Sequence, residues 1–192
     1  MNRIILASSS PRRKEMLERL NLNPIIVQSD IEEKLNPGET PEQISMSLAF
    51  SKSLEVSYDY KNDIVIGADT IVVFKGEILG KPKDDNDAYR MLKMLSGNVH
   101  EVITGISIIK ADLNIKVVDY EITKVKFKEL SSDRIIRYIS TKEPNDKAGS
   151  YGIQDLGAIL VEKIDGCYFN VVGLPLSKLD NLLDRYFNFK IF

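Results

Sequence analysis

The 192-residue chain has very few of the side chains that build cross-links, with one cysteine, Cys167, and one histidine, His100. A single cysteine excludes an intrachain disulfide, and this usage is typical of a reducing compartment. With one histidine and no cysteine cluster, zinc sites and cysteine–histidine nucleophile pairs have no support in the sequence. His100 opens a predicted strand, where we expect a surface side chain without a catalytic role.

Long apolar runs and an excess of one charge are also missing. The apolar run at the amino end is too short for a signal peptide, and no stretch is long enough to span a bilayer. The 26 Lys and Arg residues nearly balance the 28 Asp and Glu residues, for a net charge of −2. This balance argues against general affinity for nucleic acids or anionic membranes. We therefore expect a soluble cytoplasmic protein whose positive sites are local.

What the sequence does contain is an ordered series of strand-like and helix-like segments. Strands at first alternate with helices, and antiparallel-looking strands follow, which indicates an α/β fold with a mixed sheet flanked by helices. The length suits one domain, 1–192, with two lobes around a cleft. We expect strands over 3–7, 24–29, 63–74, 77–79, 99–110, 115–128, 158–164 and 168–172. We expect helices over 11–20, 41 to about 56, 84 or 85 to 96, 131 or 132 to 143, and about 176 to 186.

The stretch "ILASSSPRRKEML" (residues 5–17) places two arginines where a helix usually carries acidic residues. Ser10 is a favoured N-cap residue and Pro11 a favoured first helical residue, so Arg12 and Arg13 lie in the first turn. Two cations at the positive end of the helix dipole are unfavourable unless an anion binds there. Free N–H groups, the hydroxyls of Ser8 and Ser10, and two guanidinium groups would together hold a phosphate chain.

Asp69 interrupts an apolar run that extends from 64 to 74. A carboxylate inside a buried strand is costly unless it is paired, bound to a metal or facing a wet cleft. Near a phosphate chain it could hold Mg²⁺ or activate a water molecule. The alternative is a local turn in which Asp69 and Thr70 form a solvated bend, and the sequence leaves both interpretations open.

Two lysines could neutralise the charge of a polyphosphate. Lys52 lies on the same helical stripe as Ile44 and Leu48. The alternative interpretation is that its aliphatic stem packs against the core while its ammonium group reaches water. Lys81 follows a predicted hairpin strand, and taken alone it is an ordinary loop lysine.

Three further polar residues are candidates with equally plain alternatives. Glu33 could supply a second carboxylate to a metal, although acidic loops are usually just solvated. The amide of Gln154 could contact the edge of a nucleobase, or it could be an ordinary loop side chain. Thr70 could contact the base too, although threonine is also common in strands for its β propensity.

Four long segments, in the same order and spread over nearly the whole chain, resemble the Maf-type nucleoside triphosphate pyrophosphatases, once described as septum formation inhibitors. "ILASSSPRRKEML" resembles the amino-terminal signature of that family. The other segments are "IGADTIVVFKGEILGKP" at 66–82, "MLKMLSGNVHEVITG" at 91–105 and "EPNDKAGSYGIQDLGAILVEKIDGCYFNVVGLP" at 143–175.

The resemblance implies an enzyme that hydrolyses a nucleoside triphosphate to the monophosphate and pyrophosphate with Mg²⁺ or Mn²⁺. It also implies a fold like that of inosine triphosphate pyrophosphatase, with a central nucleotide cleft, and a homodimer. The pair Asp69-Thr70 resembles the branch that acts on dTTP and UTP. The segment Gly152–Asp155 departs from the usual Gly-Ile-Gln-Gly, because an aspartate replaces the last glycine and restricts φ beside the expected base pocket.

By resemblance, the site residues then have distinct roles. Asp69 is the proton acceptor. The positions linked to substrate choice are Arg12, Thr70 and Gln154. The polar positions that line the cleft are Ser8, Arg13, Glu33, Lys52 and Lys81.

Two alternatives stay open at this stage. The first is a pyrophosphatase for 7-methyl-GTP or for inosine-type nucleotides. The second is a regulator of septum formation in cell division that binds without turnover.

Overall fold

The computed structural model describes residues 3–31 and 38–192, so the predicted ligand Glu33 lies outside the described part of the chain. The chain divides into two compact units. Unit 1 comprises 1–69, 104–121 and 173–192, and unit 2 comprises 70–103 and 122–172. Three long strands contribute residues to both units: β3 (Ile64–Phe74), β5 (Val99–Lys110) and β6 (Ile115–Phe127).

The strands pair in the order β2-β1-β3-β5-β6-β7, and β4 (Glu77–Leu79) pairs with β3. The short strand β1 (Ile4–Leu6) is parallel to both of its neighbours, β2 (Ile25–Ile26) and β3. In contrast, β4 is antiparallel to β3, and β7 (Val161–Asp165) is antiparallel to β6. The predicted mixed α/β sheet is therefore confirmed. The central nucleotide cleft stays a prediction.

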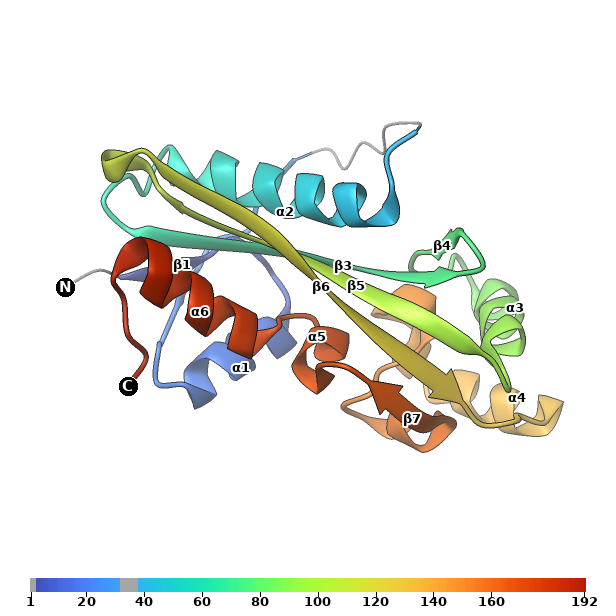
Figure 1. Ribbon diagram of the computed structural model, residues 1–192. Helices are drawn as coiled ribbons and strands as arrows, with labels where there is room; N and C mark the ends of the chain where they lie inside the picture. Colours follow the sequence, from blue (N-terminus) through green and yellow to red (C-terminus); the bar gives the residue numbers. More distant parts are fainter. Residues whose placement is uncertain (1–2, 32–37) are drawn as a thin grey trace. The chain divides into compact units, whose positions relative to one another are not determined.

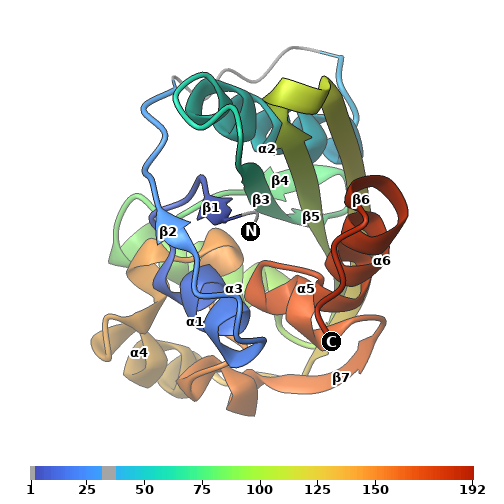
Figure 2. The same ribbon diagram turned by 90° about the vertical axis from the view of Figure 1, so that its left-hand side faces the viewer.

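In unit 1, helices lie on both faces of the strands. Figures 1 and 2 show α2 (Pro41–Ser57) on one face of β1 and β3, with α1 (Pro11–Arg19) and α6 (Leu176–Phe187) on the other. The start of α2 is set locally, because Thr40 and Gln43 form a capping box. Apolar side chains of β1, β3 and α2, with that of the residue after β1, form one core cluster: Ile5, Val65, Val56 and Ala7.

Two glycines bring α2 unusually close to the strands beneath it. A Cβ atom added to Gly67 on β3 would lie 2.4 Å from the Ala49 carbonyl oxygen, and one added to Gly105 on β5 would lie 2.2 Å from that of Ser45. A buried hydrogen bond of 2.7 Å between Ser53 Oγ on α2 and Ser107 Oγ on β5 fixes the same contact. The backbone of α2 thus packs directly on the sheet, which determines where the side chains of α2 reach β3.

Unit 2 contains the remaining helices, α3 (Asp85–Leu95), α4 (Ser132–Ser140) and α5 (Tyr168–Val172). Ile71, Val73 and Ile103 form a core cluster between its strands. Three 3₁₀ turns follow α4, at Glu143–Asp146, Ala148–Ser150 and Leu156–Leu160. A fourth 3₁₀ turn, Ala111–Leu113, connects β5 to β6 in unit 1.

Two expectations about unit 2 are wrong. The segment 168–172 is the helix α5 and not a strand, because the buried Asn170 side chain donates to Val102 O and Thr123 Oγ1 and anchors a helical turn there. His100 is buried, with 2% exposure, because the rings of Phe127 and Tyr151 pack against it edge to face. In unit 1, the predicted strand 24–29 is shorter than expected and covers only Ile25–Ile26.

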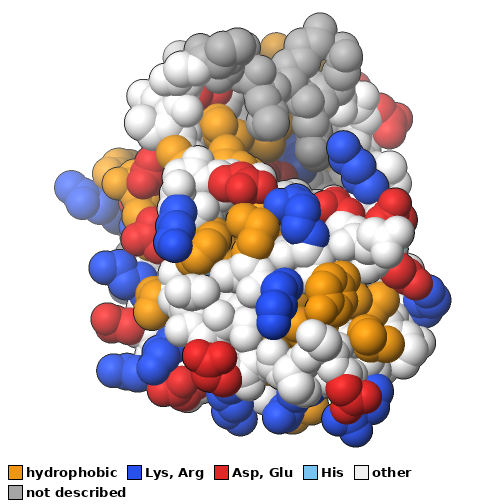
Figure 3. Space-filling view, turned by 90° about the vertical axis from the view of Figure 1, so that its right-hand side faces the viewer, with side chains coloured by type: hydrophobic (Ala, Val, Ile, Leu, Met, Phe, Trp, Pro, Cys, Tyr) orange, Lys and Arg blue, Asp and Glu red, His pale blue; other side chains and the backbone are white. Residues whose placement is uncertain are grey.

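The surface agrees with the balanced composition. On the face drawn in Figure 3, acidic and basic side chains are interspersed. Within residues 3–31 and 38–192, no helix is both long and apolar enough to cross a membrane.

Candidate functional site

The start of α1 holds one arginine in a defined position. Ser10 is the N-cap residue, as predicted, but its side chain makes no capping hydrogen bond, and the first turn carries no acidic residue. Arg13 donates from Nη1 to Ser8 Oγ at 3.1 Å and from Nε to the Gly173 carbonyl oxygen at 2.8 Å. Ser8 Oγ also accepts from the Ser10 backbone N–H at 3.2 Å. These contacts order the loop between β1 and α1, and Arg12 is half-buried in the same first turn.

The strand register brings this loop next to β3. Leu6 pairs with Ile66 in the parallel ladder of β1 and β3, and the Ala7 N–H donates to the Ile66 carbonyl oxygen at 2.8 Å. Neighbouring strands lie about 4.8 Å apart. The chain that carries Ser8 therefore leaves β1 beside the part of β3 that leads into Asp69.

Asp69 lies inside a continuous strand and forms an ion pair with Lys52 of α2. The distance from Lys52 Nζ to Asp69 Oδ1 is 2.6 Å, and the two side chains are only 15% and 13% exposed. Because side chains alternate along a strand, Asp69 points to the same face as Gly67, where α2 packs closely on β3. The solvated-bend interpretation of Asp69 is therefore wrong, and the Lys52 ammonium contacts a carboxylate.

Three predicted residues belong to unit 2. Thr70 follows Asp69 on β3 and is half-buried, whereas Lys81 is exposed just after β4. Gln154 is half-buried in the loop that precedes the 3₁₀ turn Leu156–Leu160, and its Oε1 atom is buried without a hydrogen-bond partner in the described part of the chain. The structure thus joins Ser8 to Arg13 and Lys52 to Asp69.

Comparison with known proteins adds to this geometry. The family model described as "Maf-like protein" matches residues 3–186. The chain belongs to the Maf family. It is 54% identical over 189 residues to a protein of Clostridioides difficile (strain 630) named dTTP/UTP pyrophosphatase, covering 98% of this chain and 97% of the relative. It is also 50% identical over 192 residues to a protein of the same name from Alkaliphilus oremlandii (strain OhILAs), covering 100% of both.

A solved structure is also similar, at a lower level. The Ham1 protein of Coxiella burnetii aligns with a TM-score of 0.46 at 15% identity, covering 83% of this chain and 91% of that one.

The Maf chain offers one well-placed carboxylate to a divalent ion. In the described ranges, no three His, Cys, Asp or Glu side chains form a group that could hold a metal. Mg²⁺ is usually bound through one or two carboxylates together with the phosphates of the substrate. Asp69 has a second oxygen besides the one that contacts Lys52, so it fits a divalent ion that binds together with a triphosphate.

Sequence reasoning missed a second polar cluster of the Maf chain, in unit 2. Tyr138 donates to Glu143 Oε1 at 2.8 Å, and Glu143 accepts from two backbone N–H groups near Gln154. Glu143 lies at the start of the fourth segment that resembles the family, which was its only signal in the sequence.

Proposed function

We propose that this chain hydrolyses nucleoside triphosphates, with dTTP and UTP as preferred substrates, to the nucleoside monophosphate and pyrophosphate. The observation that carries the proposal is the ion pair of Lys52 and Asp69, nearly buried at the middle of β3 in a Maf-family chain. The full-length relatives at 50% identity or more that are named dTTP/UTP pyrophosphatase support the choice of substrate.

The amino end of α1 would bind the phosphate chain. Backbone N–H groups at a helix start and the positive end of the helix dipole attract anions. Arg12 and Arg13 lie in that first turn, and a guanidinium group binds phosphate oxygens through two parallel hydrogen bonds. Ser8 supports Arg13 through the hydrogen bond of 3.1 Å, and Ser10 would add its hydroxyl to the phosphate site.

Asp69 would act as the proton acceptor for the attacking water. The water oxygen forms a bond to the α-phosphorus, its proton passes to the Asp69 carboxylate, and the bond between the α-phosphorus and the bridging oxygen breaks to release pyrophosphate. Lys52 holds the carboxylate in one orientation through the contact of 2.6 Å. Together with Lys81, it would offset the negative charge of the leaving pyrophosphate.

A divalent ion completes the proposed site. Mg²⁺ or Mn²⁺ held by Asp69 would supply charge neutralisation at the phosphates when it is bound. Glu33 remains a proposed second ligand.

Base selection would fall to Thr70 and Gln154. Uracil and thymine both present an N3–H donor, whereas cytosine presents an acceptor at N3. An unpaired amide oxygen such as Gln154 Oε1 can accept the N3–H bond and would leave cytosine without a partner. Asp155, in place of the usual glycine, is exposed beside Gln154.

A panel of nucleotides tests the proposal. Purified protein is incubated with dTTP, UTP, CTP, inosine triphosphate and 7-methyl-GTP, each with Mg²⁺ and with Mn²⁺, and pyrophosphate release is measured. We expect the highest kcat/KM for dTTP and UTP. A preference for 7-methyl-GTP or inosine triphosphate would assign another specificity, and nucleotide binding without turnover would support a regulator of cell division. The proposed homodimer is checked on the same sample by light scattering.

A further inference from the structure

Both carboxylate oxygens of Glu143 accept hydrogen bonds from backbone N–H groups in the segment that follows Gln154. Oε1 accepts from the Tyr138 hydroxyl at 2.8 Å and from the Gly157 backbone N–H at 2.9 Å. Oε2 accepts from the Leu156 backbone N–H at 3.0 Å. With three donors on two oxygens, the carboxylate is occupied by the protein itself, so its role is to order the backbone.

Tyr138 extends the same network to the residue before the Ile153–Gln154 pair. Its hydroxyl accepts from the Gly152 backbone N–H at 3.2 Å while it donates to Glu143. Burial, and then the bond to Glu143, raise the pKa of the Tyr138 hydroxyl, so it stays protonated and can donate. Gly152 is thus fixed by Tyr138, and Leu156 and Gly157 are fixed by Glu143.

The loop between these fixed points is also closely packed. A Cβ atom on Gly157 would lie 2.6 Å from the Gly152 carbonyl oxygen and 2.7 Å from the Tyr138 hydroxyl oxygen. The two ends of 152–157 therefore touch, and Gln154 lies at the turn between them. Its Oε1 atom is buried without a described partner, which is costly for a polar group unless a ligand supplies a donor.

We infer that Glu143 is a positioning residue for substrate selection, which acts through Tyr138 and the backbone of 152–157 to hold the Gln154 amide in place. This inference rests on the proposed function, since it takes Gln154 as the group that contacts the base. A negative charge at this position is needed because charge-assisted hydrogen bonds to backbone N–H groups are stronger than neutral ones. Loss of Glu143 leaves the phosphate site of unit 1 intact and frees the Gln154 loop.

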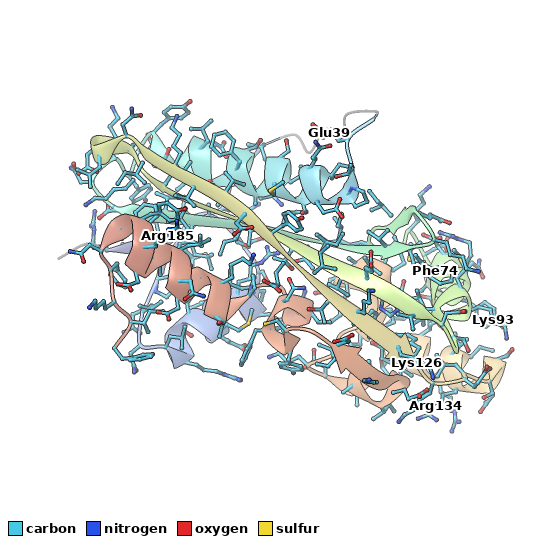
Figure 4. All side chains as sticks on the ribbon, in the orientation of Figure 1. Glu39, Phe74, Lys93, Lys126, Arg134 and Arg185 are labelled. Atoms are coloured by element: carbon cyan, nitrogen blue, oxygen red, sulfur yellow. The ribbon has the colours of Figure 1, made fainter. Side chains whose placement is uncertain are left out.

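The test compares the discrimination of UTP from CTP, as the ratio of their kcat/KM values, in the wild type and five variants. In Glu143→Ala and Tyr138→Phe we expect this ratio to fall about tenfold through a higher KM for UTP, with kcat within about threefold, because misplacing a contact group weakens binding. Glu143→Gln keeps one carbonyl oxygen and should restore part of the ratio. The control is Glu162→Gln, which removes an exposed carboxylate of the same unit that pairs with Lys126 (labelled in Figure 4) at 2.9 Å.

Amide hydrogen exchange provides a readout independent of turnover. The N–H groups of Leu156 and Gly157 should exchange faster in Glu143→Ala than in the wild type. Their exchange rates should be unchanged in Glu162→Gln. If Glu143→Ala shows no cooperative thermal transition, that variant is not folded, and the inference is then tested with Tyr138→Phe.

Gln154→Ala separates the two ways in which the idea can fail. If Gln154→Ala lowers the UTP/CTP ratio but Glu143→Ala and Tyr138→Phe do not, the inference about Glu143 is wrong and the proposed function stands. If Gln154→Ala leaves the ratio unchanged, the base contact in the proposed function is wrong, and the role of Glu143 falls with it.

Discussion

Replacing Asp69 by asparagine tests the chemistry proposed for this chain with the smallest change in shape. The asparagine amide oxygen can still accept from Lys52 Nζ, which now lies 2.6 Å from the carboxylate. The side chain can no longer take a proton from water, and it carries no charge. The substitution therefore separates the role of Asp69 in the reaction from its role in packing.

The expected loss of activity follows from the role of a general base, whose removal typically costs between 10² and 10⁴ in rate. We expect kcat to fall at least about 100-fold. The KM for UTP should stay within about fivefold, because Arg12 and Arg13, which bind the phosphates in the proposed site, are unchanged.

The expected loss of stability is moderate. Removing one partner of a fully buried ion pair costs about 3–5 kcal/mol. Here the Lys52 and Asp69 side chains are 15% and 13% exposed, and the asparagine keeps one hydrogen bond. We therefore expect about 1–3 kcal/mol, the usual range for a weakened buried polar contact. In a chain of this size, at about 2–4 °C per kcal/mol, the fall in Tm is about 2–12 °C, and we expect the variant to be folded at 25 °C.

Three measurements on one preparation decide the matter: pyrophosphate release, calorimetric binding of UTP, and thermal unfolding. The matched control is Asp119→Asn, which also breaks an aspartate–lysine pair of unit 1, with Lys178 at 3.2 Å, but at a more exposed position. The control should turn over UTP like the wild type. Turnover by Asp69→Asn within about threefold of the wild type would refute the assignment of Asp69 as proton acceptor, since a general base contributes far more.

Three further predictions follow from the same structure. Gly67→Ala places a Cβ 2.4 Å from the Ala49 carbonyl oxygen, so α2, which carries Lys52, must shift. We expect the free energy of unfolding in urea to fall by about 1–3 kcal/mol and kcat to decrease. An unchanged kcat would show that the position of Lys52 is not critical. Burial lowers the pKa of His100 from 6.5 to about 4. The unfolded chain then binds the extra proton first, so the contribution of His100 to the free energy of unfolding should decrease as the pH falls from 6.5 to about 4 and level off below, by about 3 kcal/mol at about 1.4 kcal/mol per pKa unit. Urea titrations at several pH values check this, and the same decrease in His100→Gln would contradict it. Chelation with EDTA should abolish pyrophosphate release, and added Mg²⁺ or Mn²⁺ should restore it; full activity in EDTA would contradict the proposed need for a metal.

The sequence predicted the elements whose signals are local. The capping box of Thr40 and Gln43 marks the start of α2, Pro11 marks the start of α1, and Lys75-Gly76 marks the turn into β4. Each signal depends on residues within four positions of one another, so the chain displays it before any tertiary contact forms.

The errors arise where distant contacts override local preference. The segment 168–172 is rich in aromatic and β-branched residues, which favour a strand, yet Asn170 bonds to Val102 and Thr123 and the segment is helical. The sequence predicted a surface position for His100 because the residues near it in the chain give no sign of burial. In the structure His100 Nε2 forms a hydrogen bond of 2.8 Å with the hydroxyl of Tyr151, which lies 51 positions later in the sequence.

By itself the sequence determined the order of helices and strands, the family resemblance and the list of polar candidates. Only the tertiary structure decided what those candidates do in the fold: it paired Lys52 with Asp69, bound Arg13 to Ser8, and placed Glu143 against the Gln154 loop. The physical reason is that the charge and hydrogen-bonding capacity of a side chain are properties of its residue type. Its partner and its exposure depend on how closely the backbones pack, as at Gly67, where the missing Cβ lets α2 approach β3.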